Sequence, residues 1–185
     1  MRASDKSTVL GGNACNSAQI LAQLNHDVYL ISSLSDDRDA QWIQSQLTAL
    51  KIDTAGCVIK PGFATPGSSI WLNRQNGSRT IVHYRDLPEL SCQDLSQLDM
   101  SAYDWIHIEG RNIAVVENFL ATRNSVPASG CCRVSLEIEK PRSGIEALLP
   151  YVNTVIISSH YLAAKDISPE SCFDSPGLTR RKGRL

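Results

Sequence analysis

Hydrophobic and polar positions alternate between two periods along this chain, and each change of period marks a border between helix and strand. Helical spacing is predicted for residues 13–24 and 36–52. The apolar faces of these helices are Ala14, Ala18, Leu21 and Leu24 in the first and Trp42, Ile43, Leu47 and Leu50 in the second. Acidic residues at positions 36, 37 and 39 stand where a helix dipole favours negative charge, which supports the second helix.

Strand-like runs separate these helices and continue after them. The runs rich in β-branched and other apolar residues are residues 27–34, 56–60, 105–108, 132–140 and 153–158. Helical segments at residues 114–123 and 143–152 lie between the last three runs. Strands that alternate with helices in this way predict an α/β fold with a mostly parallel sheet covered on both faces.

One segment departs from this rhythm. Residues 68–84, "SSIWLNRQNGSRTIVHY", form two β-type runs around Asn76 and Gly77, a pair of residues typical of tight hairpin turns. An antiparallel hairpin inside an alternating α/β chain predicts a small subdomain or flap.

The end of the chain also differs. Residues 166–185 contain two Ser-Pro pairs and a basic cluster, without sustained periodicity. The composition predicts a disordered tail of residues 166–185 that follows a domain of residues 1–165.

Composition excludes several classes of function. Lysine and arginine total 18 and aspartate and glutamate 19, so a formal net charge of -1 gives no basis for binding nucleic acid or an anionic membrane. The six cysteines lack the spacing of a zinc site, and we expect reduced thiols. No signal peptide or transmembrane run is recognised, which leads us to expect a cytoplasmic protein.

Candidate binding residues stand where predicted strands end and helices begin, which is where open α/β sheets bind ligands. Gly12, Asn13 and Asn16 open the first helix, with Asn13 as its expected N-cap. Asparagine side chains offer a donor and an acceptor for the hydroxyls of a sugar, and glycine lets a ligand reach the backbone. The alternative is an ordinary glycine turn with an asparagine cap.

Three charged residues complete the candidates. Arg79, after the hairpin turn, suits a phosphate contact, and the alternative is a solvent-exposed cross-strand charge. Glu109 and Glu139 lie at strand ends, where carboxylates help to hold hydrated Mg²⁺. Either glutamate equally suits a salt bridge at the end of a strand.

Four segments taken together show a resemblance to a known family. "GGNACNSAQILAQL", "NGSRTIVHYRDLPELS", "DWIHIEGRN" and "RVSLEIEKPR", in this order, are similar to the ketohexokinases, or hepatic fructokinases, of the PfkB/ribokinase-like carbohydrate kinase family. The likeness runs from about residue 9 to about residue 160 and rests on long, specific motifs.

The resemblance implies a three-layer α/β/α sandwich with a small β-sheet lid, to which the hairpin would belong, and a homodimer formed through the lids. It implies transfer of the γ-phosphate of ATP, with Mg²⁺, to a ketose, converting fructose to fructose 1-phosphate. By the same resemblance, Gly12, Asn13 and Asn16 correspond to sugar-binding positions and Arg79 to an ATP-phosphate contact.

Two departures qualify this expectation. The family begins with a strand that carries a sugar-binding aspartate, and residues 1–10 do not reproduce it. The family's Gly-Ala-Gly-Asp motif, whose aspartate is the catalytic base, is absent from these 185 residues. We therefore expect a domain truncated at both ends and inactive as it stands. The alternatives are a non-catalytic isoform that pairs with the full-length kinase through the lid, or another ribokinase-like sugar or nucleoside kinase.

Overall fold

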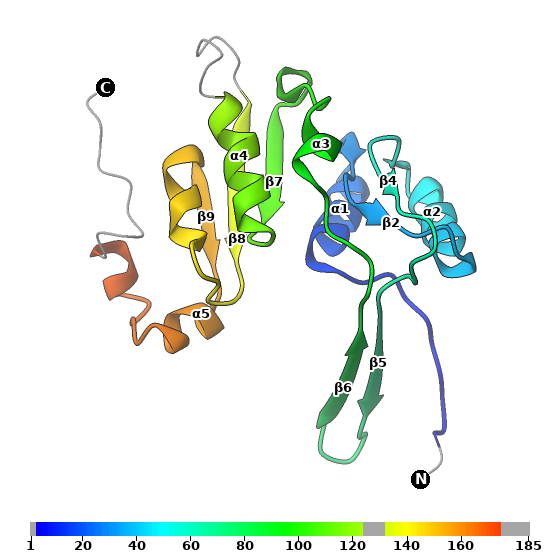
Figure 1. The fold of residues 1–185 in the computed structure, drawn as a ribbon. Helices are drawn as coiled ribbons and strands as arrows, with labels where there is room; N and C mark the ends of the chain where they lie inside the picture. The colour runs from blue at the N-terminus through cyan, green and yellow to red at the C-terminus, as the bar shows by residue number, and fades with distance from the viewer. Residues whose placement is uncertain (1–2, 124–131, 175–185) are drawn as a thin grey trace. The chain divides into compact units, whose positions relative to one another are not determined.

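A computed structural model describes residues 3–123 and 132–174 of the chain (Figure 1). The chain divides into two compact units, Met1–Leu90 and Ser91–Leu185. Part of the tail that we predict to be disordered, from residue 175 onward, lies outside the described residues. Each of the five cysteines in the described ranges is a free thiol.

The first unit combines two helices with short parallel strands and one hairpin. Its elements are α1 (Asn13–Gln23), β1 (Val28–Tyr29), β2 (Ser33–Leu34), α2 (Arg38–Ala49), β3 (Ile52–Asp53), β4 (Val58–Ile59), β5 (Gly67–Leu72) and β6 (Arg79–Tyr84). Strand β1 pairs in parallel with β3, and β2 pairs in parallel with β4. Strands β5 and β6 pair antiparallel, so the predicted hairpin is confirmed.

The single strand expected at residues 27–34 is wrong in detail. The run is interrupted between β1 and β2, and its two halves pair with different partners. Val28 lies opposite Ile52, whereas Ser33 lies opposite Val58. The sequence does not predict β3, the strand that pairs with β1. Strand β3 has only two residues and follows a helix directly, and periodicity cannot be recognised over so few residues.

The core of the first unit lies between α1, α2 and β3. Ala18, Leu47 and Ile52 are buried there. The predicted apolar face of α2 is confirmed for three of its four residues, since Leu47 is completely buried and Ile43 and Leu50 pack beside it, whereas Trp42 is not part of this cluster. The face of α1 is rotated from the predicted one. Leu21 and Leu24 are exposed, and Cys15 and Ala22 pack against Ala18 instead.

The second unit is built around a parallel three-stranded sheet. Its elements are α3 (Cys92–Leu95), η1 (Met100–Ala102), β7 (Trp105–Glu109), α4 (Ile113–Arg123), β8 (Arg133–Ile138), η2 (Ile145–Tyr151), β9 (Thr154–Ile157), α5 (Ser159–Ala164) and η3 (Ser171–Asp174). The strand order is β7-β8-β9. Parallel pairing between strands joined by helices confirms the predicted α/β class.

Side chains of β8 form the centre of the second core. Leu136 and Ile138 are completely buried, and Ile145 and Leu148 of η2 pack with them. Gly110, just after β7, is part of this close packing. A Cβ at this position would lie 2.6 Å from the carbonyl oxygen of Glu137 and 2.6 Å from Cδ1 of Ile145. A glycine is therefore required where β7 turns toward α4.

Candidate functional site

The amino terminus of α1 presents the residues predicted to bind a sugar. Gly12 is the N-cap of the helix, with φ of 95°. The space beside its Cα is open, because a Cβ added there would contact only Cβ of Cys15, at 4.0 Å. Asn13 is the first helical residue, so its predicted N-cap role is wrong by one position. No side chain caps this helix, and a positive φ at the N-cap suits glycine better than asparagine.

Asn16 lies one turn further along the same helix. Its amide nitrogen donates to the carbonyl oxygen of Gly12 at 2.8 Å, which is the first regular helical bond. Its side chain is exposed and accepts a long bond of 3.5 Å from Gln19. Cys15 and Ala18, on the opposite side, hold the helix to the core. The exposed backbone at Gly12 and the side-chain amide of Asn16 therefore remain available to a polar ligand.

Arg79 is the first residue of β6, opposite Leu72 of β5. Every residue of both strands is exposed, and Figure 1 shows the hairpin extending away from α1 and α2 of its own unit. Among the described residues, the side chain of Arg79 makes no hydrogen bond or ion pair. The guanidinium is thus free to contact an anion, and its place on the hairpin makes its position depend on the position of the hairpin.

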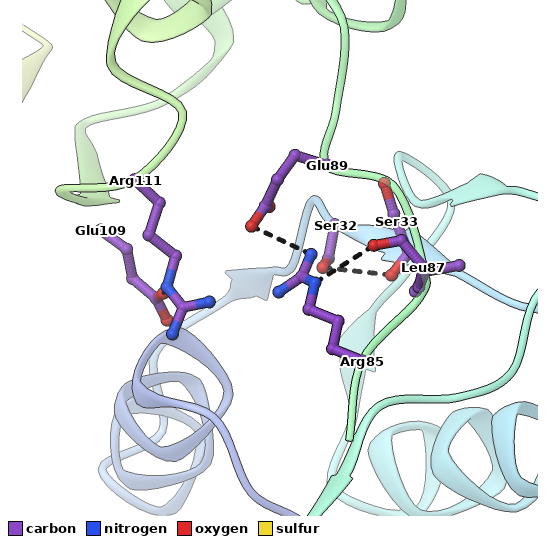
Figure 2. Close-up of polar contacts among 7 residues, drawn as sticks. All are labelled: Ser32, Ser33, Arg85, Leu87, Glu89, Glu109 and Arg111. Atoms are coloured by element: carbon purple, nitrogen blue, oxygen red, sulfur yellow. Dashed lines mark hydrogen bonds and ion pairs between the residues drawn. The ribbon is translucent and has the colours of Figure 1, made fainter. Parts of the chain in front are cut away.

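The carboxyl end of β7 carries Glu109. Its Oε2 lies 3.0 Å from Nε of Arg111, an ion pair that matches the strand-end alternative considered for this residue (Figure 2). Asn112 follows with φ of 48°, and α4 begins at Ile113. A carboxylate, a guanidinium and an amide are therefore presented together where a strand gives way to a helix.

Glu139 lies beyond the end of the adjacent strand, β8. Its Oε1 is 3.7 Å from Nζ of Lys140, and its carbonyl oxygen accepts a hydrogen bond of 2.5 Å from the hydroxyl of Ser158. Directly across from Glu109, the residue in register is Glu137. Residues in register on paired strands lie on the same face of the sheet, so Glu137 lies beside Glu109. The two-residue spacing of Glu137 and Glu139 in "LEIE" is the sequence signal that points to Glu137, because residues two apart in a strand share a face.

The structure brings the predicted residues together in two groups. Gly12, Asn13 and Asn16 form one helical turn of the first unit, and Arg79 stands on the hairpin of that unit. Glu109 and Glu139 lie at the ends of neighbouring strands in the second unit. Within the described ranges no cluster of three or more histidine, cysteine, aspartate or glutamate side chains is arranged to hold a metal ion. Nor does any helix there have the length and apolar character needed to span a membrane.

Comparison with known proteins identifies the family. A family profile described as "pfkB family carbohydrate kinase" matches residues 1–164. Mouse ketohexokinase is 33% identical over 153 residues, which are 80% of this chain and 51% of that protein. The chain therefore spans about half the length of this curated relative.

Solved structures agree on the fold. A fructokinase from Xylella fastidiosa with bound ATP superposes with a TM-score of 0.70 at 15% identity, covering 90% of this chain and 56% of that one. A ribokinase from Giardia lamblia also gives a TM-score of 0.70, at 12% identity over 86% of this chain and 51% of that one. The predicted ribokinase-like fold is confirmed, and the chain belongs to the pfkB family of carbohydrate kinases.

Proposed function

We propose that this chain forms the sugar-binding and lid portion of an ATP-dependent ketohexokinase, which phosphorylates fructose to fructose 1-phosphate. The observation that carries the proposal is the 33% identity to mouse ketohexokinase within the shared family. The open turn at Gly12 and the amides of Asn13 and Asn16 support a polyol ligand, because amide groups both donate to and accept from hydroxyls.

ATP supplies the γ-phosphoryl group in this proposal, and a solved fructokinase relative has ATP bound. Arg79 would hold phosphate oxygens, for which a guanidinium is suited by its fixed fork of donors. Mg²⁺ keeps most of its waters and needs only one or two protein carboxylates. Glu109 and Glu139 fit that requirement as strand-end carboxylates, although each already has a cationic neighbour.

Catalysis requires more than these residues. Phosphoryl transfer depends on positioning and on groups that stabilise the transferring phosphate, and the family's Gly-Ala-Gly-Asp motif does not occur among the 185 residues. We propose that the 185-residue polypeptide binds the sugar without phosphorylating it. Release of ADP that depends on fructose would show that this part of the proposal is wrong.

Sugar binding is tested by calorimetric titration of the chain with D-fructose, and with D-ribose and adenosine as competing ligand classes. Asn16→Ala should abolish fructose binding without loss of stability, because Asn16 is exposed and alanine favours helices. Gln23→Ala, an exposed position at the other end of α1, is the matched control and should bind as before. Tighter binding of ribose or adenosine than of fructose would favour another ribokinase-like kinase.

The exposed hairpin supports a second candidate, a non-catalytic subunit that pairs with itself or with the complete kinase through the lid. One face carries Trp71, Val82 and Tyr84, with exposed fractions of 56%, 60% and 58%. The opposite face carries Ile70 and Ile81, also exposed. Apolar residues on both faces of a two-stranded sheet are costly in water, so we propose a homodimer through the hairpin.

The dimer is tested by sedimentation of the purified chain. Trp71→Glu should convert a dimer to a monomer, because it places a charge on an apolar contact surface. Val9→Glu is the matched control, since Val9 is 77% exposed and lies outside the hairpin. A monomeric parent chain, or equal effects of both substitutions, would contradict pairing through the hairpin.

A further inference from the structure

The orientation of the β5–β6 hairpin is set at its base. No residue of either strand is buried, so the strands themselves do not pack against the core of the first unit. At the tip, Arg74 lies 3.5 Å from Asp5, but both side chains are more than 70% exposed and such surface pairs contribute little. Whatever fixes the direction of the hairpin must therefore act where its two stems leave the unit.

On the incoming stem, Thr65 is held by the carboxylate of Asp37. The Thr65 amide donates to Oδ2 of Asp37 at 2.7 Å, and its hydroxyl donates to Oδ1 at 2.6 Å. The hydroxyls of Ser35 and Thr65 lie 2.8 Å apart, and the side chain of Ser35 is buried. Thr65 is two residues from the start of β5, so this contact immediately precedes the strand.

The same carboxylate is the N-cap of α2, where it accepts the amide of Ala40 at 2.8 Å. Partial burial acts to raise the pKa of Asp37, but the bonds from Thr65 and Ala40 outweigh it and hold that pKa well below its usual range. Asp37 is therefore a charged acceptor at any physiological pH. One side chain joins the start of a core helix to the stem of the hairpin.

The outgoing stem is tied to the same place. Asp86, two residues after β6, accepts the amide of Ala64 at 3.0 Å and the hydroxyl of Tyr84 at 3.0 Å. Leu87 is buried, and Nε of Arg85 donates to its carbonyl oxygen at 3.1 Å (Figure 2). Both stems thus converge on residues 64–65, and the exposed part of the hairpin begins directly beyond them.

We infer that Asp37 and Thr65 are a positioning pair that sets the angle of the hairpin, and with it the place of Arg79. Pro66 follows with a fixed φ and Gly67 with a freely variable one, so rotation is concentrated just after the anchored threonine. Only the statement that the hairpin places Arg79 for a phosphate contact rests on the proposed function. The anchoring itself is a property of the described contacts.

Fluorine NMR of the chain labelled with 5-fluorotryptophan tests this directly, because its three tryptophans report on three regions. Trp71 lies on β5, Trp42 on α2, and Trp105 on β7 of the other unit. Thr65→Val removes the hydroxyl while keeping the shape of the side chain. We expect the Trp71 resonance to shift or broaden, while those of Trp42 and Trp105 stay in place.

Hydrogen exchange supplies the second readout. In Thr65→Val the amide of residue 65 should exchange about tenfold faster, while amides paired across β5 and β6 keep their rates, because the hairpin would move as one piece. Thr65→Ser retains the hydroxyl and should restore both parent signals. Thr122→Val is the matched control, since it removes a threonine hydroxyl bonded to the carbonyl oxygen of Phe119, far from the hairpin in sequence.

An unchanged Trp71 resonance in a variant with faster exchange at residue 65 would overturn the inference. If Trp42 also shifts in Thr65→Val, the first unit has been perturbed as a whole, and Asp37→Asn decides. Asparagine remains a good N-cap but is an uncharged acceptor. Movement of Trp71 alone in Asp37→Asn supports the positioning pair, and no movement refutes it. Neither measurement needs ligand or activity, so failure to bind fructose leaves this test unaffected.

Discussion

The sheet β7-β8-β9 and the hairpin β5–β6 are both rich in β-branched and aromatic residues, yet they are used in opposite ways. Leu136 and Ile138 of the sheet are completely buried beneath η2. In the hairpin, Ile70 and Ile81 are 60% and 50% exposed. High β-propensity therefore forms the strands in both cases, but only the sheet uses its apolar side chains to stabilise its own unit. The apolar side chains of the hairpin remain exposed instead.

The largest difference between the two regions should appear on truncation of a side chain. Leu136→Ala should lower the free energy of unfolding by about 2–5 kcal/mol, because it removes buried methyl groups and leaves a cavity. Ile70→Ala, the matched change in the hairpin, should cost less than about 0.5 kcal/mol in the monomer. Urea unfolding at low protein concentration measures both. Equal losses would mean that the hairpin also contributes to a core.

Gly110→Ala tests the close packing behind the sheet. Its Cβ would lie 2.6 Å from a backbone oxygen, so the backbone between β7 and α4 must shift. We expect a loss of about 1–3 kcal/mol, as for other overpacked cores. Gly67→Ala is the control at the base of the hairpin, where no atom lies within 4 Å of the added Cβ. Thermal unfolding of the two variants would contradict this reasoning if their midpoints matched.

A pH titration should reveal the hydrogen bond between the buried Tyr161 and Glu146 in the second unit. Burial, with the hydrogen bond to the carboxylate of Glu146, raises the pKa of Tyr161 to about 12. A raised folded-state pKa adds stability that is complete below the unfolded value of about 10 and is lost as the pH rises above it. The second unit should therefore weaken above about pH 10.

Tyr161→Phe should remove this alkaline loss and cost about 1 kcal/mol at neutral pH, because the bond to Glu146 is gone. Urea unfolding followed through the fluorine resonance of Trp105 in the chain labelled with 5-fluorotryptophan gives the stability of the second unit at each pH. Tyr151→Phe is the control, as a partly buried tyrosine of the same unit. If the alkaline loss persists in Tyr161→Phe, another group is responsible for it.

The smallest expected change concerns the hairpin turn. Gly77 has φ of 69°, and alanine at such a position costs about 1 kcal/mol. Gly77→Ala should therefore speed exchange at the amides of β5 and β6 without altering the global unfolding of either unit. Gly62→Ala, with φ of 80° outside the hairpin, should leave those amides unchanged. A global loss of stability in Gly77→Ala would show that the hairpin is coupled to a core.

The sequence by itself determined the alternation of helices and strands, the hairpin around Asn76 and Gly77, and the family. These follow from local periodicity, turn chemistry and long motifs, none of which requires knowledge of distant contacts. The glycine and asparagines at the start of α1 were also recognisable as candidates, because residue type and spacing are local properties.

Only the tertiary structure decided how those elements are partnered. The division of residues 27–34 into two strands depends on β3 and β4, and the face that α1 buries depends on where the core of the first unit lies. The bonds from Thr65 to Asp37 join residues 28 positions apart, and the register of Glu109 with Glu137 joins separate strands. Contacts between residues distant in sequence arise from the packing of the whole unit, so no local pattern encodes them.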